Sequence, residues 1–167
     1  ADENVLCDPF RIIDGQKFRN YESEVNERMS LATALEQSCD TYFYDVGQRP
    51  YTYTQQNREP QPFWARKLGF GELTGVDLPS ARGRVPDARF KATYSLYRDN
   101  PIYNLWTSGD AVQMAIGQGD LLVTPLQVAR LYALIANGGK LVTPHLADRI
   151  EGRDAYRFSF PAKSEVK

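Results

Sequence analysis

A helix with clear start and stop signals is the feature that most constrains the fold of this chain. Thr124 is a suitable N-cap, Pro125 suits the first helical position, and Gln127 completes a capping box. The pair at 138–139 is Gly-Gly, which favours a left-handed helix stop. The sequence therefore predicts a helix from Thr124 to about Asn137.

One face of this helix is expected to be buried. Residues at helical spacing form an apolar face of Val128, Leu131, Tyr132 and Ile135, beside a thin face of Ala129, Ala133 and Ala136. After the glycines, residues 140–143 have the pattern of a short strand.

A second helix is indicated earlier in the chain, with Ser30 as its N-cap. Its apolar face has i, i+3, i+4 and i+7 spacing, formed by Leu31, Ala34, Leu35 and Ser38. This spacing places Ser38 on the buried face. A new helical spacing then starts with Cys39, Phe43 and Val46, so residues 38–40 are expected where two helical pieces meet.

The middle of the chain is predicted to be largely irregular. Residues 48–62 are polar and contain several prolines, which indicates a loop or a broken helix before a helical segment at 63–68. Residues 69–103 are punctuated by glycine and proline and should consist mostly of turns. Connections of this length are more often functional than accidental.

Composition excludes several function classes. The formal net charge is -1, which does not fit a general nucleic-acid binder. The cysteines are Cys7 and Cys39, and one histidine is present, so no zinc-binding framework can be assembled. The sequence leaves room for a single disulfide bond between these two cysteines. No stretch approaches the ~20 apolar residues of a membrane span.

Common catalytic and cofactor motifs do not fit the chain. The sequence contains no nucleophile-elbow serine for which His145 could act as general base. His145 is therefore interpreted as a structural or surface residue. Gly117 and Gly119 could begin a dinucleotide fingerprint, but the third glycine position holds Leu122. No phosphate-binding loop occurs either, and we predict no cofactor.

Ser38 and Asp40 are the candidate site residues. A serine and an acid two positions apart, after an apolar helix and before the aromatic run 42–44, can both point into one cleft. We expect Cys39 to turn into the interior, away from Cys7, as a free buried thiol. The alternative is that Ser38 and Asp40 are helix-capping residues, which both types favour.

Sequence blocks that follow one another in a fixed order favour a functional role for Ser38 and Asp40. They are residues 31–44 (LATALEQSCDTYFY), 67–79 (KLGFGELTGVDLP), 106–119 (WTSGDAVQMAIGQG), and 122–127 (LVTPLQ) with 136–139 (ANGG). Together they closely resemble class B penicillin-binding proteins, the monofunctional D,D-transpeptidases of bacterial cell-wall synthesis, and their elongation-type branch in particular. Asp40 in place of asparagine in the Ser-x-Asn motif fits that branch.

The resemblance implies an α/β fold of the serine β-lactamase and penicillin-binding-protein transpeptidase type, of which this chain would supply mainly the helical part and short strands. It also implies serine acyl transfer, in which the serine of a Ser-x-x-Lys motif attacks a stem-peptide carbonyl. Ser38 would then relay a proton to the leaving amine, and Asp40 would hold the lysine or the donor peptide.

The chain departs from the family in two motifs. No Lys-Thr-Gly occurs, and Leu73-Thr74-Gly75 lacks the lysine. The literal Ser-x-x-Lys at 164–167 follows the middle motif instead of preceding it, and we interpret it as accidental. Residues 1–167 are therefore expected to be the central segment of a transpeptidase domain, without its nucleophile, general base or carboxylate anchor.

The resemblance also implies partners and a location. The partners would be peptidoglycan stem peptides, β-lactam antibiotics, a SEDS-family glycan polymerase with other elongation machinery, and the missing parts of the domain, for which a second chain is one source. The parent would lie at the periplasmic face of the inner membrane, with its anchor outside this chain. Two alternatives stay open: a non-catalytic scaffold or interaction module, and a β-lactamase or D,D-carboxypeptidase on the same fold.

Overall fold

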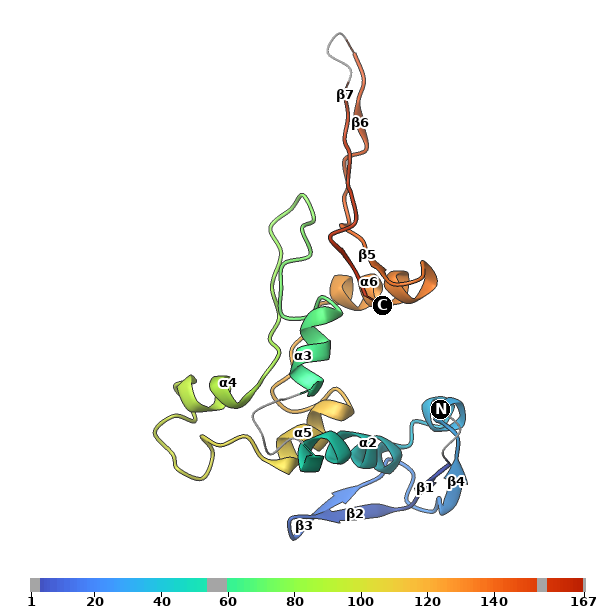
Figure 1. Cartoon of the computed structure of the whole chain (residues 1–167), viewed down its shortest axis with the longest axis vertical. Helices are drawn as coiled ribbons and strands as arrows, with labels where there is room; N and C mark the ends of the chain where they lie inside the picture. Colours follow the sequence, from blue (N-terminus) through green and yellow to red (C-terminus); the bar gives the residue numbers. More distant parts are fainter. Residues whose placement is uncertain (1–3, 54–59, 153–155, 167) are drawn as a thin grey trace. The chain divides into compact units, whose positions relative to one another are not determined.

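The computed structural model describes residues 4–53, 60–152 and 156–166, which belong to two compact units (Figure 1). The first unit contains residues 1–61 and 86–120, and the second contains residues 62–85 and 121–167. The chain therefore leaves the first unit, returns to it once and leaves again. Each unit combines short helices with two-stranded sheets.

The first unit begins with two small antiparallel sheets. Strand β1 (Val5–Cys7) pairs with β4 (Glu27–Met29), and β2 (Phe10–Ile13) forms a hairpin with β3 (Gln16–Arg19). The helices of this unit are α1 (Leu31–Glu36), α2 (Asp40–Tyr53), α4 (Ala88–Thr93) and α5 (Ser108–Ala115).

Helices α2 and α5 pack closely at Gly47. A Cβ atom added to Gly47 would lie 2.7 Å from the Cβ of Ala115 and 3.2 Å from the carbonyl oxygen of Ala111. Any larger side chain would therefore force the helices apart. The interior of this unit includes a cluster around Cys7, Met29 and Cys39, and a cluster of Ile13, Tyr44 and Val112.

The second unit contains most of α3 (Pro60–Lys67), together with α6 (Pro125–Ala136). Strand β5 (Lys140–Leu141) pairs with β8 (Ser164–Glu165), and β6 (Arg149–Ile150) pairs with β7 (Tyr156–Arg157). Figure 1 shows β6 and β7 on a long two-stranded extension that leaves the unit after β5.

The start and stop signals of α6 are confirmed. Thr124 is the N-cap and forms the capping box with Gln127, and the helix ends at Ala136 with Asn137 as its C-cap. Gly138 and Gly139 both have positive φ, as a left-handed stop requires. The predicted strand at 140–143 is present only as the two residues of β5.

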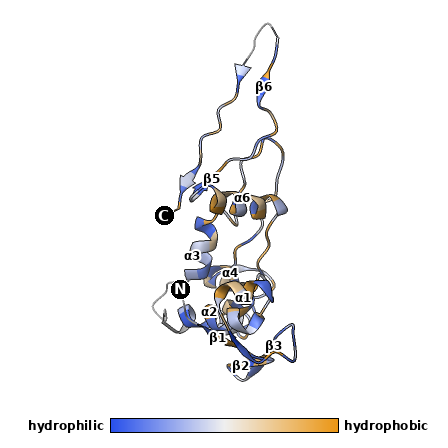
Figure 2. Ribbon diagram, turned by 90° about the vertical axis from the view of Figure 1, so that its right-hand side faces the viewer, coloured by the Kyte–Doolittle hydropathy of each residue, from blue (hydrophilic) through white to orange (hydrophobic). Residues whose placement is uncertain are grey.

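The predicted buried face of α6 is wrong. The buried residues are Gln127, Arg130 and Leu134, whereas Tyr132 and Ile135 are 69% and 66% exposed. Polar side chains are buried here because Gln127 and Arg130 donate hydrogen bonds to backbone carbonyls of neighbouring irregular segments, for Arg130 that of Val142 just after β5. Figure 2 shows that α6 is largely hydrophobic. The hydropathy of its residues therefore did not distinguish the buried face from the exposed face.

Helix α1 is confirmed with a different buried face. Ser30 is its N-cap and accepts a hydrogen bond from Thr33 N. Of the predicted face, Ala34 is buried, but Leu31 and Leu35 are exposed. Because α1 has six residues, it is too short to bury a continuous apolar stripe.

The irregular middle is mostly confirmed. Helix α2 continues through Pro50 to Tyr53 and α3 starts at Pro60, so the described residues of 48–62 are helical, and residues 54–59 lie outside the described part. Pro50 sits near the end of α2, where its missing N–H costs one hydrogen bond of the last turns. Within 69–103, α4 is a short helix in a segment composed mainly of turns.

Candidate functional site

Ser38 and Asp40 lie at the junction of α1 and α2, as predicted. Ser38 follows the end of α1 and has a φ of 53°, so it interrupts the helical path instead of continuing it. Its expected burial is wrong, because the left-handed turn leaves Ser38 exposed. Asp40 is the first residue of α2 and is half-buried.

Each residue from Cys39 to Thr41 is attached to a segment far upstream. Cys39 forms a disulfide with Cys7 of β1. Thr41 is fully buried, donates from Oγ1 to Asp8 O (3.0 Å) and accepts from Asp8 N (3.1 Å). The start of α2 is thus bound to the end of β1 by a covalent bond and a pair of hydrogen bonds.

Asp40 is attached to the segment after β3. Its backbone N–H donates to Asn20 Oδ1 at 2.8 Å, and its carboxylate Oδ2 accepts from Tyr21 N at 2.9 Å. Neither Asn20 nor Tyr21 was identified from the sequence, because an asparagine or tyrosine after a strand is an ordinary turn residue. Their relation to Asp40 arises only from the folded chain.

The prediction of a free Cys39 thiol directed away from Cys7 is wrong. The two Cα atoms are 6.2 Å apart, the side chains are both 1% exposed, and the sulfurs are bonded. Helical geometry correctly predicted that Cys39 is buried, but not that β1 supplies the partner. The signal available in the sequence was that Cys7 is its single potential partner in the chain.

The first-turn hydrogen bonds identify Cys39 at the cap position of α2. Tyr42 N donates to Cys39 Sγ at 3.3 Å, three residues along the chain. The carboxylate of Asp40 is directed to Tyr21 N, outside its own helix. These bonds do not favour the alternative in which Ser38 and Asp40 serve as helix caps. The groove expected to be shared by Ser38 and Asp40 stays a prediction.

Burial sets the electrostatics of Asp40. Loss of solvent raises the pKa of its carboxyl above the ordinary value, while the hydrogen bond from Tyr21 N opposes that shift. Tyr44, one turn along α2, has a pKa raised first by burial and second by the charge of Asp40. The second carboxylate oxygen of Asp40 is a potential hydrogen-bond acceptor.

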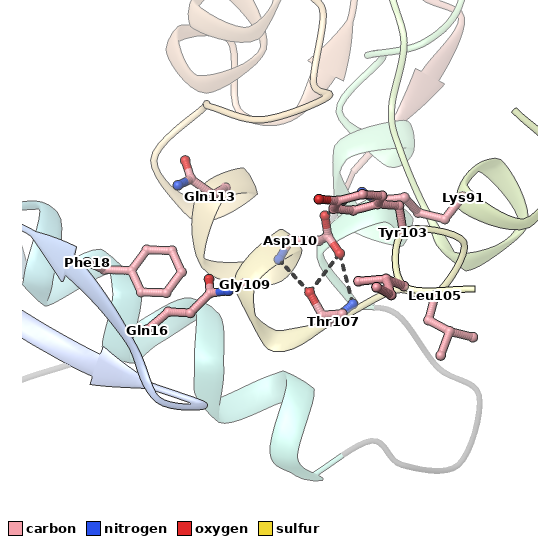
Figure 3. Close-up of a pocket in the computed structure, with 10 residues that line it drawn as sticks. Gln16, Phe18, Lys91, Tyr103, Leu105, Thr107, Gly109, Asp110 and Gln113 are labelled. Atoms are coloured by element: carbon pink, nitrogen blue, oxygen red, sulfur yellow. Dashed lines mark hydrogen bonds and ion pairs between the residues drawn. The ribbon is translucent and has the colours of Figure 1, made fainter. Parts of the chain in front are cut away.

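A cavity of about 340 Å³ lies in the same unit, between the β2–β3 hairpin and the start of α5 (Figure 3). Its walls include Phe18 and Gln16 from the hairpin and Thr107 and Asp110 from the capped end of α5. The Thr107 and Asp110 side chains are hydrogen-bonded to each other in the capping box of α5. The capping box therefore fixes the positions of these two side chains relative to each other.

A buried ion cluster borders this cavity and was missed in the sequence. Lys91 Nζ lies 2.8 Å from Asp110 Oδ1, 3.6 Å from Asp120 Oδ2 and 4.3 Å from the centre of the Tyr97 ring. Burial alone would lower the pKa of Lys91, but the hydrogen bond and charge of Asp110, with Asp120, leave it raised. Lys91 is a charged structural residue here, without the lowered pKa expected of a general base.

The residues set aside in the sequence occupy other positions. His145 is exposed and stacks on Phe160 at 3.8 Å between ring centres, which confirms a surface role. Ser164 lies in β8 and is exposed, whereas Lys167 falls outside the described residues. Within the described part of the chain, no group of three or more His, Cys, Asp or Glu side chains could hold a metal ion.

Comparison with known families decides the relationship of the chain. The family model for the penicillin binding protein transpeptidase domain matches residues 1–167. The chain belongs to this family. The predicted fold class is confirmed: the structure is part of a penicillin-binding-protein transpeptidase fold, with mixed helices and short strands.

Individual relatives place the chain near PBP2 and MrdA. It is 34% identical over 140 residues to the peptidoglycan D,D-transpeptidase MrdA of Acinetobacter baumannii, covering 83% of this chain and 19% of that protein. The structure of PBP2 from Helicobacter pylori is 33% identical with a TM-score of 0.77, covering 99% of this chain and 27% of that one. The chain thus spans about a fifth of the length of the curated relative, 19%.

Two further solved structures are of assemblies. One is a complex between PBP2 and MreC from Helicobacter pylori, 34% identical with a TM-score of 0.74, covering 96% of this chain and 27% of that one. The other is described as structural coordination of polymerization and crosslinking by a peptidoglycan synthase complex, 28% identical with a TM-score of 0.67, covering 99% and 26%. In the part of the present chain that the structure describes, no helix has the length and apolar character needed to cross a membrane.

Proposed function

We propose that this chain is the central segment of the transpeptidase domain of a peptidoglycan D,D-transpeptidase, which cross-links stem peptides through a serine acyl-enzyme and is acylated by β-lactams. The match of the transpeptidase family model to residues 1–167 carries the proposal. In the order of the family motifs, the nucleophile and general base come from chain preceding this segment, and the carboxylate anchor from chain following it. The isolated segment is then inactive.

Within that reaction, Ser38 is the proton relay. The nucleophilic serine oxygen forms a bond to the stem-peptide carbonyl, and the bond from that carbonyl to the terminal D-alanine nitrogen breaks. The serine proton passes to the active-site lysine and through the Ser38 hydroxyl to the leaving amine. The exposed position of Ser38 at a helix junction supports this role, because its hydroxyl is accessible to another segment.

Asp40 holds the lysine or the donor peptide in this scheme. Its half-buried carboxylate is oriented by Tyr21 N through Oδ2, which leaves Oδ1 as an acceptor for an ammonium or amide group. The charge of such a lysine would lower the pKa of Asp40 from the raised value that burial produces.

We further propose an extracytoplasmic location, at the periplasmic face of the inner membrane, with the anchor outside this segment. The Cys7–Cys39 disulfide supports this location, because such bonds persist in oxidising compartments. Partners of the parent would be a SEDS-family glycan polymerase and other elongation machinery. The complexes of related proteins, with MreC and in a peptidoglycan synthase, support this type of assembly.

The deciding experiment compares two serine variants in the complete protein. Ser38→Ala should slow acylation by a fluorescent penicillin by ~10²–10⁴ and leave the melting temperature nearly unchanged. Ser30→Ala is the matched control, since it removes the N-cap of α1 and should cost about 1 kcal/mol of stability with normal acylation. A destabilised Ser38→Ala protein that acylates normally would end the relay proposal.

The same protein distinguishes the other function classes. A transpeptidase yields a long-lived penicilloyl adduct and cross-linked muropeptides. Rapid hydrolysis of the adduct would indicate a β-lactamase, and release of D-alanine without cross-linked product would indicate a D,D-carboxypeptidase. A complete protein that takes no label would indicate the non-catalytic scaffold.

A further inference from the structure

Asn20 connects the disulfide to the Ser38–Asp40 motif. Its side chain is buried, with 7% exposure, and its Oδ1 accepts from Asp40 N at 2.8 Å. On the other side, its Nδ2 donates to Glu22 O at 3.0 Å and contacts Cys7 Sγ at 3.6 Å. Both ends of the amide are thus occupied, which fixes the orientation of the group.

The hydrogen bond to Asp40 N satisfies a donor that α2 cannot satisfy itself. Asp40 is the first residue of α2, and the first N–H groups of a helix have no acceptor within the helix. Asn20 supplies that acceptor from the segment after β3. A side chain without an oxygen at this position would leave the N–H of Asp40 unpaired in a half-buried setting.

A second hydrogen bond from the same segment orients the Asp40 carboxylate. Tyr21 follows Asn20 in the chain, and Tyr21 N donates to Asp40 Oδ2 at 2.9 Å. The two bonds run in opposite directions between residues 20–21 and residue 40, so they restrain both the backbone and the side chain of Asp40. Displacing Asn20 would displace the Tyr21 donor with it.

The disulfide keeps these two segments together. Cys39 immediately precedes Asp40, and Cys7, its partner, contacts the Asn20 amide. Without the bond, β1 and the start of α2 would be held by the Thr41–Asp8 hydrogen bonds and by packing of the surrounding core. The covalent bond limits the separation between Cys7 and Asp40, and the Nδ2–Sγ contact attaches Asn20 to Cys7.

We propose that Asn20 is a positioning residue for Asp40, and that the Cys7–Cys39 disulfide holds Asn20 and Asp40 at hydrogen-bonding distance. This inference rests on the catalytic role proposed above for Ser38 and Asp40. Asn20 acts through Asp40 and does not itself contact the substrate. A displacement of about 1 Å at a reacting group can reduce a rate by ~10², so loss of this restraint should be measurable.

The test uses the complete protein and separates β-lactam binding from acylation. Asn20→Ala should lower the acylation rate constant at saturating β-lactam by roughly ten- to a hundred-fold, with little change in the dissociation constant of the initial complex. In an Asp40→Ala background, Asn20→Ala should produce no further loss, because both act through the same carboxylate. Asn26→Ala, at an exposed position of the following loop, is the control.

Two further variants cover the case in which Asn20→Ala fails to fold. Asn20→Asp keeps an acceptor for Asp40 N, but it removes the Nδ2 donor and adds a negative charge beside Asp40. The acid limb of the acylation pH profile should then move to higher pH. The double variant Cys7→Ala, Cys39→Ala should lower the saturating acylation rate constant, again without weakening initial binding.

The outcomes separate this inference from the proposed function. Normal acylation in Asp40→Ala would overturn the role of Asp40 and the positioning role together. Slow acylation in Asp40→Ala, combined with normal acylation and an unshifted pH profile in the folded Asn20 variants, would overturn the positioning role alone. A cysteine double variant that melts earlier but acylates normally would overturn the part assigned to the disulfide.

Discussion

The side-chain amide of Gln127 donates a 2.8 Å hydrogen bond to the backbone carbonyl of Glu72, 55 residues earlier in the chain. The same nitrogen donates to Arg82 O at 2.7 Å, and the amide oxygen accepts from Thr124 N at 2.9 Å. One side chain therefore closes the capping box of α6 and anchors both ends of an irregular segment. This explains why a glutamine is fully buried there.

Replacing Gln127 by alanine should destabilise the complete protein by about 2–5 kcal/mol, because it leaves two carbonyls without their donor and opens the capping box. Gln118→Ala is the control, since Gln118 is exposed and should change stability by less than about 0.5 kcal/mol. Denaturant unfolding measures both. Equal midpoints for the two variants would contradict the anchoring role.

A pair of glycines tests the close approach of residues 83 and 122. Gly83 has a φ of 65°, and a Cβ there would lie 2.3 Å from Leu122 O. Gly117 has a φ of 72° with nothing within 4 Å of its Cβ position. Both changes to alanine should carry the left-handed penalty of about 1 kcal/mol, and Gly83→Ala should cost clearly more in thermal unfolding. A smaller loss of stability for Gly83→Ala than for Gly117→Ala would show that the bridge between Arg84 and Leu122 shifts readily to make room for a side chain.

The carboxylate of Asp77 should titrate below its ordinary range. Its pKa is lowered by hydrogen bonds from Ala147 N and Leu146 N. Because the folded-state pKa lies below the unfolded one, the stabilisation is complete above about pH 3.9 and is lost as the pH falls through the lowered value. Amide chemical shifts of Leu146 and Ala147 should report that midpoint, and Asp77→Asn should abolish the transition. A midpoint above about 3.9 would contradict the two bonds.

The 167-residue chain by itself should not form a stable acyl-enzyme. It has no upstream Ser-x-x-Lys and no Lys-Thr-Gly, so the proposed nucleophile, base and carboxylate anchor are lacking. Incubation with a fluorescent penicillin and denaturing electrophoresis should show no covalent band, whereas the complete protein should be labelled. A label mapped by mass spectrometry to a serine of this chain, Ser164 included, would contradict this expectation.

The features that the sequence predicted correctly depend on short-range interactions. The caps at Ser30 and Thr124 involve hydrogen bonds to residues three positions along the chain, and the junction at Ser38 follows from a break in helical spacing. Such signals are contained in a few adjacent residues. These local features therefore do not depend on how distant parts of the chain fold.

The features that were missed depend on distant partners. The buried side of α6 is set by carbonyls of residues 72, 82 and 142, and the state of Cys39 is set by β1, 32 residues earlier. Asn20 has no sequence pattern that distinguishes it from any turn asparagine. Periodicity identifies an apolar stripe, but tertiary contacts decide which residues of a largely hydrophobic helix are covered.

Helix α2 contacts α5 at Gly47, and the candidate motif lies at the N-terminal end of α2. A change at this contact would therefore tilt α2 and move the motif. Asp40 is seven residues before Gly47, which corresponds to about 10 Å along a helix. A larger side chain at Ala115, whose Cβ faces Gly47, would push on α2 near this contact, and a tilt of about 5° would move Asp40 by about 1 Å, enough to affect a reacting group. In the proposed reaction, a larger residue at Ala115 should therefore slow β-lactam acylation without contacting the drug.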